Sequence, residues 1–181
     1  MWKFKELNKP QLNLIDKRII DIGGEIDSDM ALYVREALLR LRGEGSPDVT
    51  IMITSAGGNV GIGLDIYDFL RLYPGKKTGV VNAYARSMAA VVLQACDNRQ
   101  CSVHAHILIH NSHDDVNLDT LRDWRKLKKR KGEMEKKQSR IYAILAKRTG
   151  RSITEIRKVC QRDHEMTAEE AKAFGLIDQI V

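Results

Sequence analysis

The sequence has few cysteines, and their spacing does not suggest a framework of disulfide bonds. Its 181 residues include three cysteines, Cys96, Cys101 and Cys160, with no CxxC motif. An odd and sparse set of thiols is typical of a reducing cytosol rather than of a disulfide-stapled fold. We therefore expect no disulfide, and no catalytic or metal-binding cysteine.

The sequence also lacks the segments that direct a chain into a membrane. It contains no run of about 18 uncharged apolar residues, and residues 1–8 hold no apolar signal-peptide core. No internal repeat, low-complexity tract or phosphate-binding GxxxxGK[ST] motif occurs. We expect a cytoplasmic, single-domain protein with no membrane partner and no nucleotide cofactor of its own.

Positive charge is concentrated in one segment. Residues 117–148 contain 12 Lys and Arg against 4 Asp and Glu, although the whole chain carries a net charge of only +6. Such a cluster could bind phosphate backbones, but aromatic residues are nearly absent around it. The pattern favours a solvated helix face or a subunit contact over nucleic acid. The densest part of this positively charged cluster consists of Arg122, Arg125, Lys126, Lys128, Lys129, Arg130 and Lys131.

Apolar periodicity predicts an α/β fold. Alternating strands and helices through residue 110 indicate a parallel sheet with crossover helices. The long helix expected at about 118–148 has few apolar positions in its first half, so we expect it to project and meet another subunit. Strands are expected at 19–22, 49–53, 78–83, 101–110 and 177–181, and helices from residue 28, after the glycine loop 56–58, at 87–96, from residue 152 and from residue 167.

Three polar residues suggest acyl-transfer chemistry. Ser87 lies where a predicted strand gives way to a helix, His110 closes the apolar run 106–110, and Asp163 follows Arg162. A serine hydroxyl needs an imidazole to accept its proton and a carboxylate to orient that imidazole. Alone, these residues would be a helix cap, a strand-end polar group and a loop carboxylate. Together they supply one residue for each catalytic role.

Backbone donors for an oxyanion are expected beside Ser87. A helix beginning there would point free N–H groups outward, and its dipole would favour negative charge. Gly57 and Gly58 would let the backbone approach a substrate closely, just before a second helix begins.

These landmarks resemble the ClpP family, the proteolytic subunit of the ATP-dependent Clp protease. The resemblance covers residues 17–181 and implies a crotonase-like α/β fold, built of repeated β-β-α/β-α-β units with a mostly parallel sheet. It implies one domain with a short arm at 1–16, a head at 17–110 and 149–181, and a projecting handle at 111–148. The matching segments are 53–58, 63–68, 85–89, 109–110, 147–150, 162–171 and 174–178.

The resemblance implies a serine endopeptidase. Ser87 would be the nucleophile, His110 the general base and acid, and Asp163 the residue that orients His110. The backbone N–H groups of Gly58 and Met88 would form the oxyanion hole. Peptides or unfolded proteins would be cut inside a homo-oligomer of heptameric rings, commonly two stacked, fed by an ATP-driven Clp unfoldase. No metal and no cofactor are implied.

The chain departs from the family pattern at several positions. It has Ala56 in place of a proline, Arg86 in place of an alanine, and Gln161 in place of an acidic residue, and residues 112–117 replace a glycine-rich strand. These differences leave two alternatives. One is a specialised relative, such as a phage capsid-maturation protease acting without an unfoldase. The other is a catalytically silent ring subunit.

Three further alternatives concern the chemistry. Acyl-CoA chemistry of the crotonase type would use the oxyanion hole without a triad. A Ser–Lys dyad would take its lysine from the long helix and make His110 dispensable. His104, His106 and His110 would share one face of a regular strand at 101–110, a spacing that can bind zinc. The set of Ser87, His110 and Asp163 favours the triad over all three.

Overall fold

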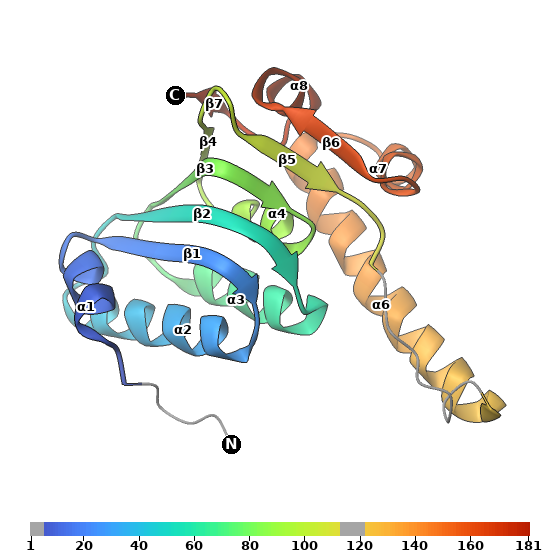
Figure 1. Cartoon of the computed structure of the whole chain (residues 1–181), viewed down its shortest axis with the longest axis horizontal. Coiled ribbons are helices and arrows are strands. Elements are labelled where there is room, and N and C mark those ends of the chain that lie inside the picture. The colour runs from blue at the N-terminus through green and yellow to red at the C-terminus, as the bar shows by residue number, and fades with distance from the viewer. Residues whose placement is uncertain (1–5, 113–121) are drawn as a thin grey trace.

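A computed structural model of the chain describes residues 6–112 and 122–181. Seven strands form one sheet, and α2, α3 and α4 lie along one face of it (Figure 1). The elements are α1 Lys9–Asp16, β1 Ile19–Ile26, α2 Ser28–Gly43, β2 Val49–Gly58, α3 Val60–Leu72, β3 Lys77–Arg86, α4 Met88–Leu93, β4 Asn98–Cys101, β5 His106–Ile109, α6 Trp124–Thr149, α7 Ile153–Cys160, β6 His164–Thr167, α8 Ala168–Phe174 and β7 Gln179–Ile180.

The sheet is mostly parallel, as the sequence predicted. Its strand order is β1-β2-β3-β4-β7, with β5 paired to β3 and β6 paired to β5. Only the β5–β6 pair is antiparallel. The inner strands are rich in branched apolar residues because crossover helices bury them, and Ile20, Ile22, Ile51 and Ile53 have no exposed surface.

The predicted single strand at 101–110 is wrong, because the structure divides it. β4 ends at Cys101, a turn follows at Val103 and His104, and β5 begins at His106. The two strands share β3, since Thr78–Val81 pairs with β4 and Tyr84–Arg86 pairs with β5. No glycine or proline marks the turn, so the apolar pattern gave no sign of it.

Other strand ends also differ from the prediction. β1 runs through Gly23 and Gly24 to Ile26, and β2 runs through the expected glycine loop to Gly58. Both extensions contain the one register shift of the β1–β2 pairing, which lies between Gly23 and Glu25. The helix α1 and the strand β6 had no counterpart in the sequence prediction. β6 is short and only Met166 in it is buried, which leaves little periodicity to detect.

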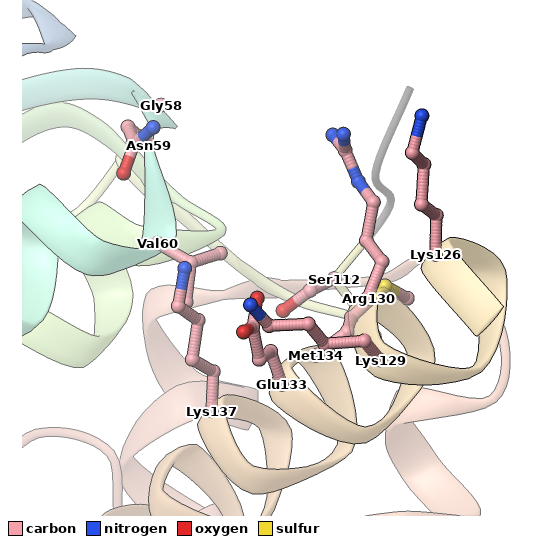
Figure 2. Close-up of a pocket in the computed structure, with 10 residues that line it drawn as sticks. All are labelled: Gly58, Asn59, Val60, Ser112, Lys126, Lys129, Arg130, Glu133, Met134 and Lys137. Carbon is pink, nitrogen blue, oxygen red and sulfur yellow. The ribbon is translucent and has the colours of Figure 1, made fainter. Parts of the chain in front are cut away.

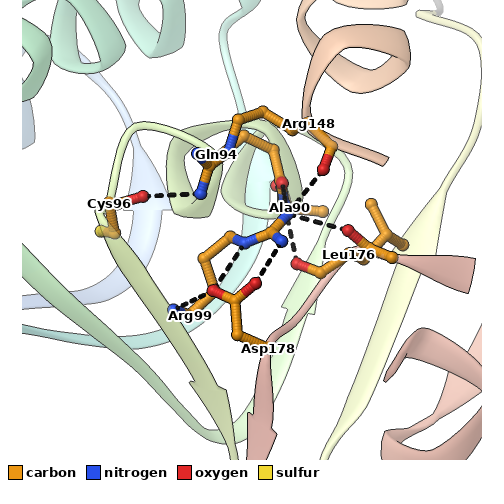
Figure 3. Close-up of polar contacts among 8 residues, drawn as sticks. Ala90, Gln94, Cys96, Arg99, Arg148, Leu176 and Asp178 are labelled. Atoms are coloured by element: carbon orange, nitrogen blue, oxygen red, sulfur yellow. Dashed lines mark hydrogen bonds and ion pairs between the residues drawn. The ribbon is translucent and has the colours of Figure 1, made fainter. Parts of the chain in front are cut away.

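A buried polar network fixes the C-terminal end of the chain against α4 (Figure 3). Arg99, 5% exposed, donates to Gln94 Oε1 at 2.7 Å and to Gly175 O at 2.8 Å, and its guanidinium pairs with Asp178. Arg148, at the end of α6, donates to Cys96 O at 2.8 Å. The network therefore holds together α4, β4, the last turn of α6 and β7.

The long helix α6 has two different halves. Ile141, Tyr142 and Leu145 bury its second half against the head, whereas its first half extends away from the head (Figure 1). This confirms the expected projection, whereas the expected contact with another subunit stays a prediction. The predicted start near residue 118 lies outside the described residues. Within residues 6–112 and 122–181, no helix is long and apolar enough to cross a bilayer.

Candidate active site

Ser87 sits in a strained turn between β3 and α4. Its φ of 53° and ψ of −122° are unusual for a residue with a side chain, a conformation that costs on the order of 1–3 kcal/mol. Its N–H donates to Leu108 O at 2.9 Å, which ties the turn to β5. Its hydroxyl makes no capping hydrogen bond to α4, so the interpretation of Ser87 as a helix cap does not hold.

His110 is the first residue after β5. The same strand contains Leu108, whose carbonyl accepts the hydrogen bond from the Ser87 N–H. Its Nδ1 lies 3.1 Å from Asp163 Oδ1. The histidine side chain is 20% exposed and the carboxylate 73% exposed. A carboxylate at Nδ1 holds the proton on that nitrogen, which makes Nε2 the basic nitrogen of the ring.

Asp163 reaches His110 because β6 pairs antiparallel with β5. Ile109 stands opposite His164 in this antiparallel pair. His110 and Asp163 come one residue further on, at the same end of the two strands, and are therefore neighbours. Asn111 reinforces the join, because its N–H donates to Cys160 O at 2.8 Å and its Oδ1 accepts from Tyr142 Oη at 2.6 Å. The residue after the histidine thus ties it to both α7 and α6.

Ser87 and His110 line one small cavity. Met88, Val91 and Ile109 form part of its wall, and α6 contributes Ile141 and Leu145. The contribution of α6 here is apolar, and no lysine lines this cavity in the described part of the chain. The arrangement therefore brings together Ser87, His110 and Asp163, and it gives no support to a Ser–Lys dyad.

The glycine segment at the end of β2 lies against Ser87. A Cβ on Gly57 would stand 2.8 Å from Ser87 Cβ and 3.0 Å from Met88 N, at a φ of +98°. Gly58 is equally confined, since its Cβ would lie 2.4 Å from Ile26 O. Met88 is the first residue of α4, so its N–H has no acceptor within the helix. The end of β2 therefore lies against Ser87 and Met88 at Gly57, and Gly58 is the next residue along the chain.

Ser55 is a positioning residue that sequence reasoning missed. It is fully buried, its hydroxyl donates to Gly24 O at 2.6 Å, and it accepts from Gly57 N at 3.1 Å. One hydroxyl thus fixes the glycine segment to β1. The sequence signal that could have indicated this role is the presence of a polar residue at the end of the buried strand run 49–55.

Arg86 and Glu165 were also missed. Arg86 pairs with Glu165 across the strand residue Leu108. The departure of Arg86 from the family pattern was visible in the sequence, but its partner could not be known without the order of β3, β5 and β6.

The histidine spacing does not form the proposed zinc site. His104 lies in the turn before β5, so the regular strand face that would align it with His106 and His110 is absent. Among the residues that the structure describes, no group of three or more His, Cys, Asp or Glu could hold a metal.

The three cysteines are free and buried. Burial raises the pKa of the Cys96 thiol to about 12 and those of Cys101 and Cys160 to about 11. These thiols are protonated at neutral pH and are therefore poor nucleophiles.

Comparison with known proteins decides the family. A sequence model described as Clp protease matches residues 4–181. The chain belongs to the Clp protease family. Two relatives from strains of Bacteroides fragilis, each named ATP-dependent Clp protease proteolytic subunit, are 31% identical to it over 191 residues. The alignments cover 98% of this chain and 87% and 82% of those proteins.

The fold agrees with the family. A mutant of ClpP1 from Listeria monocytogenes superposes with a TM-score of 0.85 at 26% identity, covering 95% of both chains. The expected ClpP fold is thereby confirmed, including its mostly parallel sheet.

Proposed function

We propose that this Clp protease family member is a serine endopeptidase that uses Ser87, His110 and Asp163. The single observation that carries the proposal is the 3.1 Å contact between His110 Nδ1 and Asp163 Oδ1, on a histidine that shares a cavity with Ser87. That contact fixes the tautomer and orientation that a general base beside a serine needs.

The reaction would proceed through an acyl-enzyme. His110 Nε2 accepts the Ser87 proton as the serine oxygen attacks the substrate carbonyl carbon. The tetrahedral intermediate then expels the amine, which takes the proton from His110. Water, deprotonated by the same imidazole, attacks the ester, and the acid product leaves with Ser87 restored. Asp163 stabilises the imidazolium in both halves of the reaction.

The N–H groups of Gly58 and Met88 would bind the oxyanion. Both are backbone donors, held by β2 and by the start of α4, so they need little reorganisation as charge develops. Removing one such donor costs about two to three orders of magnitude in other serine hydrolases.

We further propose a cytoplasmic homo-oligomer built of heptameric rings, with two rings stacked. The single domain would consist of the arm 1–16, the head and the handle 111–148, and the projecting half of α6 supports a contact between subunits. Peptides would enter unaided, and unfolded proteins would be supplied by a Clp ATPase. Most of the handle segment 112–117, in which the chain departs from the family, lies outside the described residues.

A second candidate is a specialised protease that keeps the triad and acts without an unfoldase. Gln161 favours it, since this residue ends α7 two positions before Asp163, where the family pattern has an acidic residue. A silent ring subunit is the third candidate, and the contact between His110 and Asp163 speaks against it.

The testing experiment is labelling with a fluorophosphonate across size-exclusion fractions, with the adduct mapped by mass spectrometry. We expect a single adduct on Ser87 in ring-sized fractions. An unlabelled ring would overturn serine catalysis and favour the silent subunit. Degradation of a folded substrate, measured with and without a Clp ATPase, separates the first candidate from the second.

A further inference from the structure

A second, larger cleft lies beside the catalytic cavity. It has a volume of about 540 Å³ and lies between the start of α3 and the projecting half of α6 (Figure 2). Gly58, Asn59 and Val60 form one side, and α6 side chains form the other. Ser112 lines both this cleft and the cavity of Ser87. The two spaces are therefore adjacent at Ser112.

The cleft is strongly cationic. Its α6 wall carries Lys126, Lys129, Arg130 and Lys137, and Glu133 is the single acidic residue among the described residues that line it. Lys126 has a partner in Asp123 at 3.9 Å. Lys129 and Lys137 form no ion pair with the rest of the described chain, and both are exposed. Among the described residues of the cleft, four cationic side chains therefore stand against the one carboxylate of Glu133.

Lys137 adds its charge where the backbone is already positive. A Cβ on Gly61, in the first turn of α3, would lie 3.7 Å from Lys137 Nζ. The N-terminus of a helix carries a partial positive charge of about half an elementary charge. An ammonium beside it is electrostatically unfavourable, and an anion placed between the two would be attracted by both.

The position of Gly58 connects this charge with the reaction. Gly58 lines the cleft, and the proposed mechanism assigns its N–H to the oxyanion. In that mechanism, a peptide with its scissile carbonyl at Gly58 would extend along the cleft on one side of the cut, where its side chains would face Lys129 and Lys137.

We propose that this cleft is a specificity site for acidic substrate residues, and that Lys129 and Lys137 are its specificity-determining residues. The inference rests on the proposed peptidase function and adds a substrate class to it. Carboxylates near the cleaved bond accelerate cleavage because they pair with Lys129 and Lys137, in a cleft whose described lining has an excess of positive charge.

The test is a set of fluorogenic peptides in which one Glu, Gln or Lys is moved through the positions flanking the cleaved bond. Mass spectrometry locates the cut in each peptide. We expect at least one position at which Glu exceeds its isostere Gln by about fivefold in kcat/KM, with Lys poorest. The Glu preference should shrink as salt rises from about 50 mM to about 500 mM, because screening weakens ion pairs.

Matched variants assign the preference to the cleft. Lys129→Gln and Lys137→Gln should each lower the Glu-to-Gln ratio, and the double variant should bring it near one. Lys128→Gln and Lys136→Gln remove the same charge from the same helix but do not line the cleft. They should leave the ratio unchanged.

Three results would overturn the proposal. The first is equal cleavage of Glu and Gln peptides at every position, with Ser87 labelled by the fluorophosphonate. The second is an equal loss of the Glu preference in the control variants Lys128→Gln and Lys136→Gln, which would indicate that the overall positive charge of α6 causes the preference. The third is an unchanged ratio in Lys129→Gln and Lys137→Gln with an altered sedimentation mass, which would assign the cleft to a subunit contact. No cleavage of any peptide and no Ser87 adduct would instead refute the proposed function itself.

Discussion

Arg86 and Glu165 form an ion pair that spans the strand between them. Arg86 Nη2 lies 2.7 Å from Glu165 Oε1, and Arg86 Nε donates to the same oxygen at 2.8 Å. Leu108 stands opposite both residues. Arg86 directly precedes Ser87, and Glu165 follows Asp163 by two positions. The pair therefore fastens the strand of the nucleophile to the strand that follows the carboxylate.

We predict that Arg86→Gln and Glu165→Gln lower kcat more than stability. Both side chains are 42% exposed, so the lost pair should cost less than about 1 kcal/mol of unfolding free energy. A small displacement of Ser87 relative to His110 should lower kcat by about three- to tenfold, with little change in KM. Peptide kinetics and thermal melting measure the two effects.

Rescue and a matched control make this prediction specific. The exchange of charges in Arg86→Glu with Glu165→Arg should restore part of kcat. Arg40→Gln breaks a comparably exposed pair, 2.9 Å from Asp16 and away from the triad, and should leave kcat unchanged. The positioning role is wrong if all these variants behave like Arg40→Gln.

Ser87→Ala and Asp163→Asn should nearly abolish turnover without unfolding the protein. We expect kcat to fall by about four orders of magnitude or more in each, since Ser87→Ala removes the nucleophile and Asp163→Asn disturbs the histidine tautomer. Stability should change little, because Asp163 is 73% exposed and the Ser87 hydroxyl caps no helix.

Ser139→Ala is the control for these variants. The Ser139 hydroxyl is exposed on α6 and donates to Glu135 O at 2.8 Å. Activity close to that of the native protein in either triad variant would show that the residue does not take part in the chemistry.

Gly57→Ala should abolish activity, whereas Gly132→Ala should preserve it. A Cβ on Gly57 would stand 2.8 Å from Ser87 Cβ at a φ of +98°, so either the glycine segment or the serine must move. Gly132 lies in α6, and a Cβ there meets nothing within 4 Å. Alanine at that position should raise the unfolding free energy by up to about 1 kcal/mol. Urea unfolding and peptide cleavage of both variants test this prediction. An active Gly57→Ala variant would contradict the close approach of Gly57 to Ser87.

Asp178→Asn should destabilise the fold in a pH-dependent way. Burial raises the pKa of Asp178, but hydrogen bonds from Arg99 outweigh that effect and hold the pKa below its usual value. A carboxyl with a depressed folded-state pKa contributes stability above the unfolded value, near 3.8, and loses it as the pH falls through the folded value. At pH 7 we expect a loss of about 2 kcal/mol, because the buried Arg99 would lack its carboxylate.

Urea unfolding of the native protein and of Asp178→Asn, at pH 7 and near pH 3, tests this prediction. The gap between the two stabilities should narrow at the lower pH, because the carboxyl of the native protein takes up its proton as the pH falls through the depressed folded-state pKa. Asp16→Asn, at an exposed pair, should show little difference at either pH. A gap between native protein and Asp178→Asn that stays constant with pH would contradict the role of the ion pair.

Part of the site could be predicted from the chain alone. Ser87 could be recognised because a strand-like run ends there and a short apolar helix begins. Gly57 and Gly58 indicated that the backbone approaches a substrate closely. Both are local signals, since a helix start and a glycine pair depend on neighbouring residues only. The resemblance to the ClpP family, carried by segments in register from 53 to 178, linked these signals to His110 and Asp163.

What the tertiary structure decided concerns contacts between distant strands. The turn that separates β4 from β5, the antiparallel pairing that brings Asp163 to His110, and the partner of Arg86 all depend on strand order. Strand order is set by packing over the whole sheet, which short stretches of sequence do not encode. The sequence by itself determined the residue types and their local backbone. Only the folded sheet decided which of them meet, because residues 53 positions apart touch only when their strands pair.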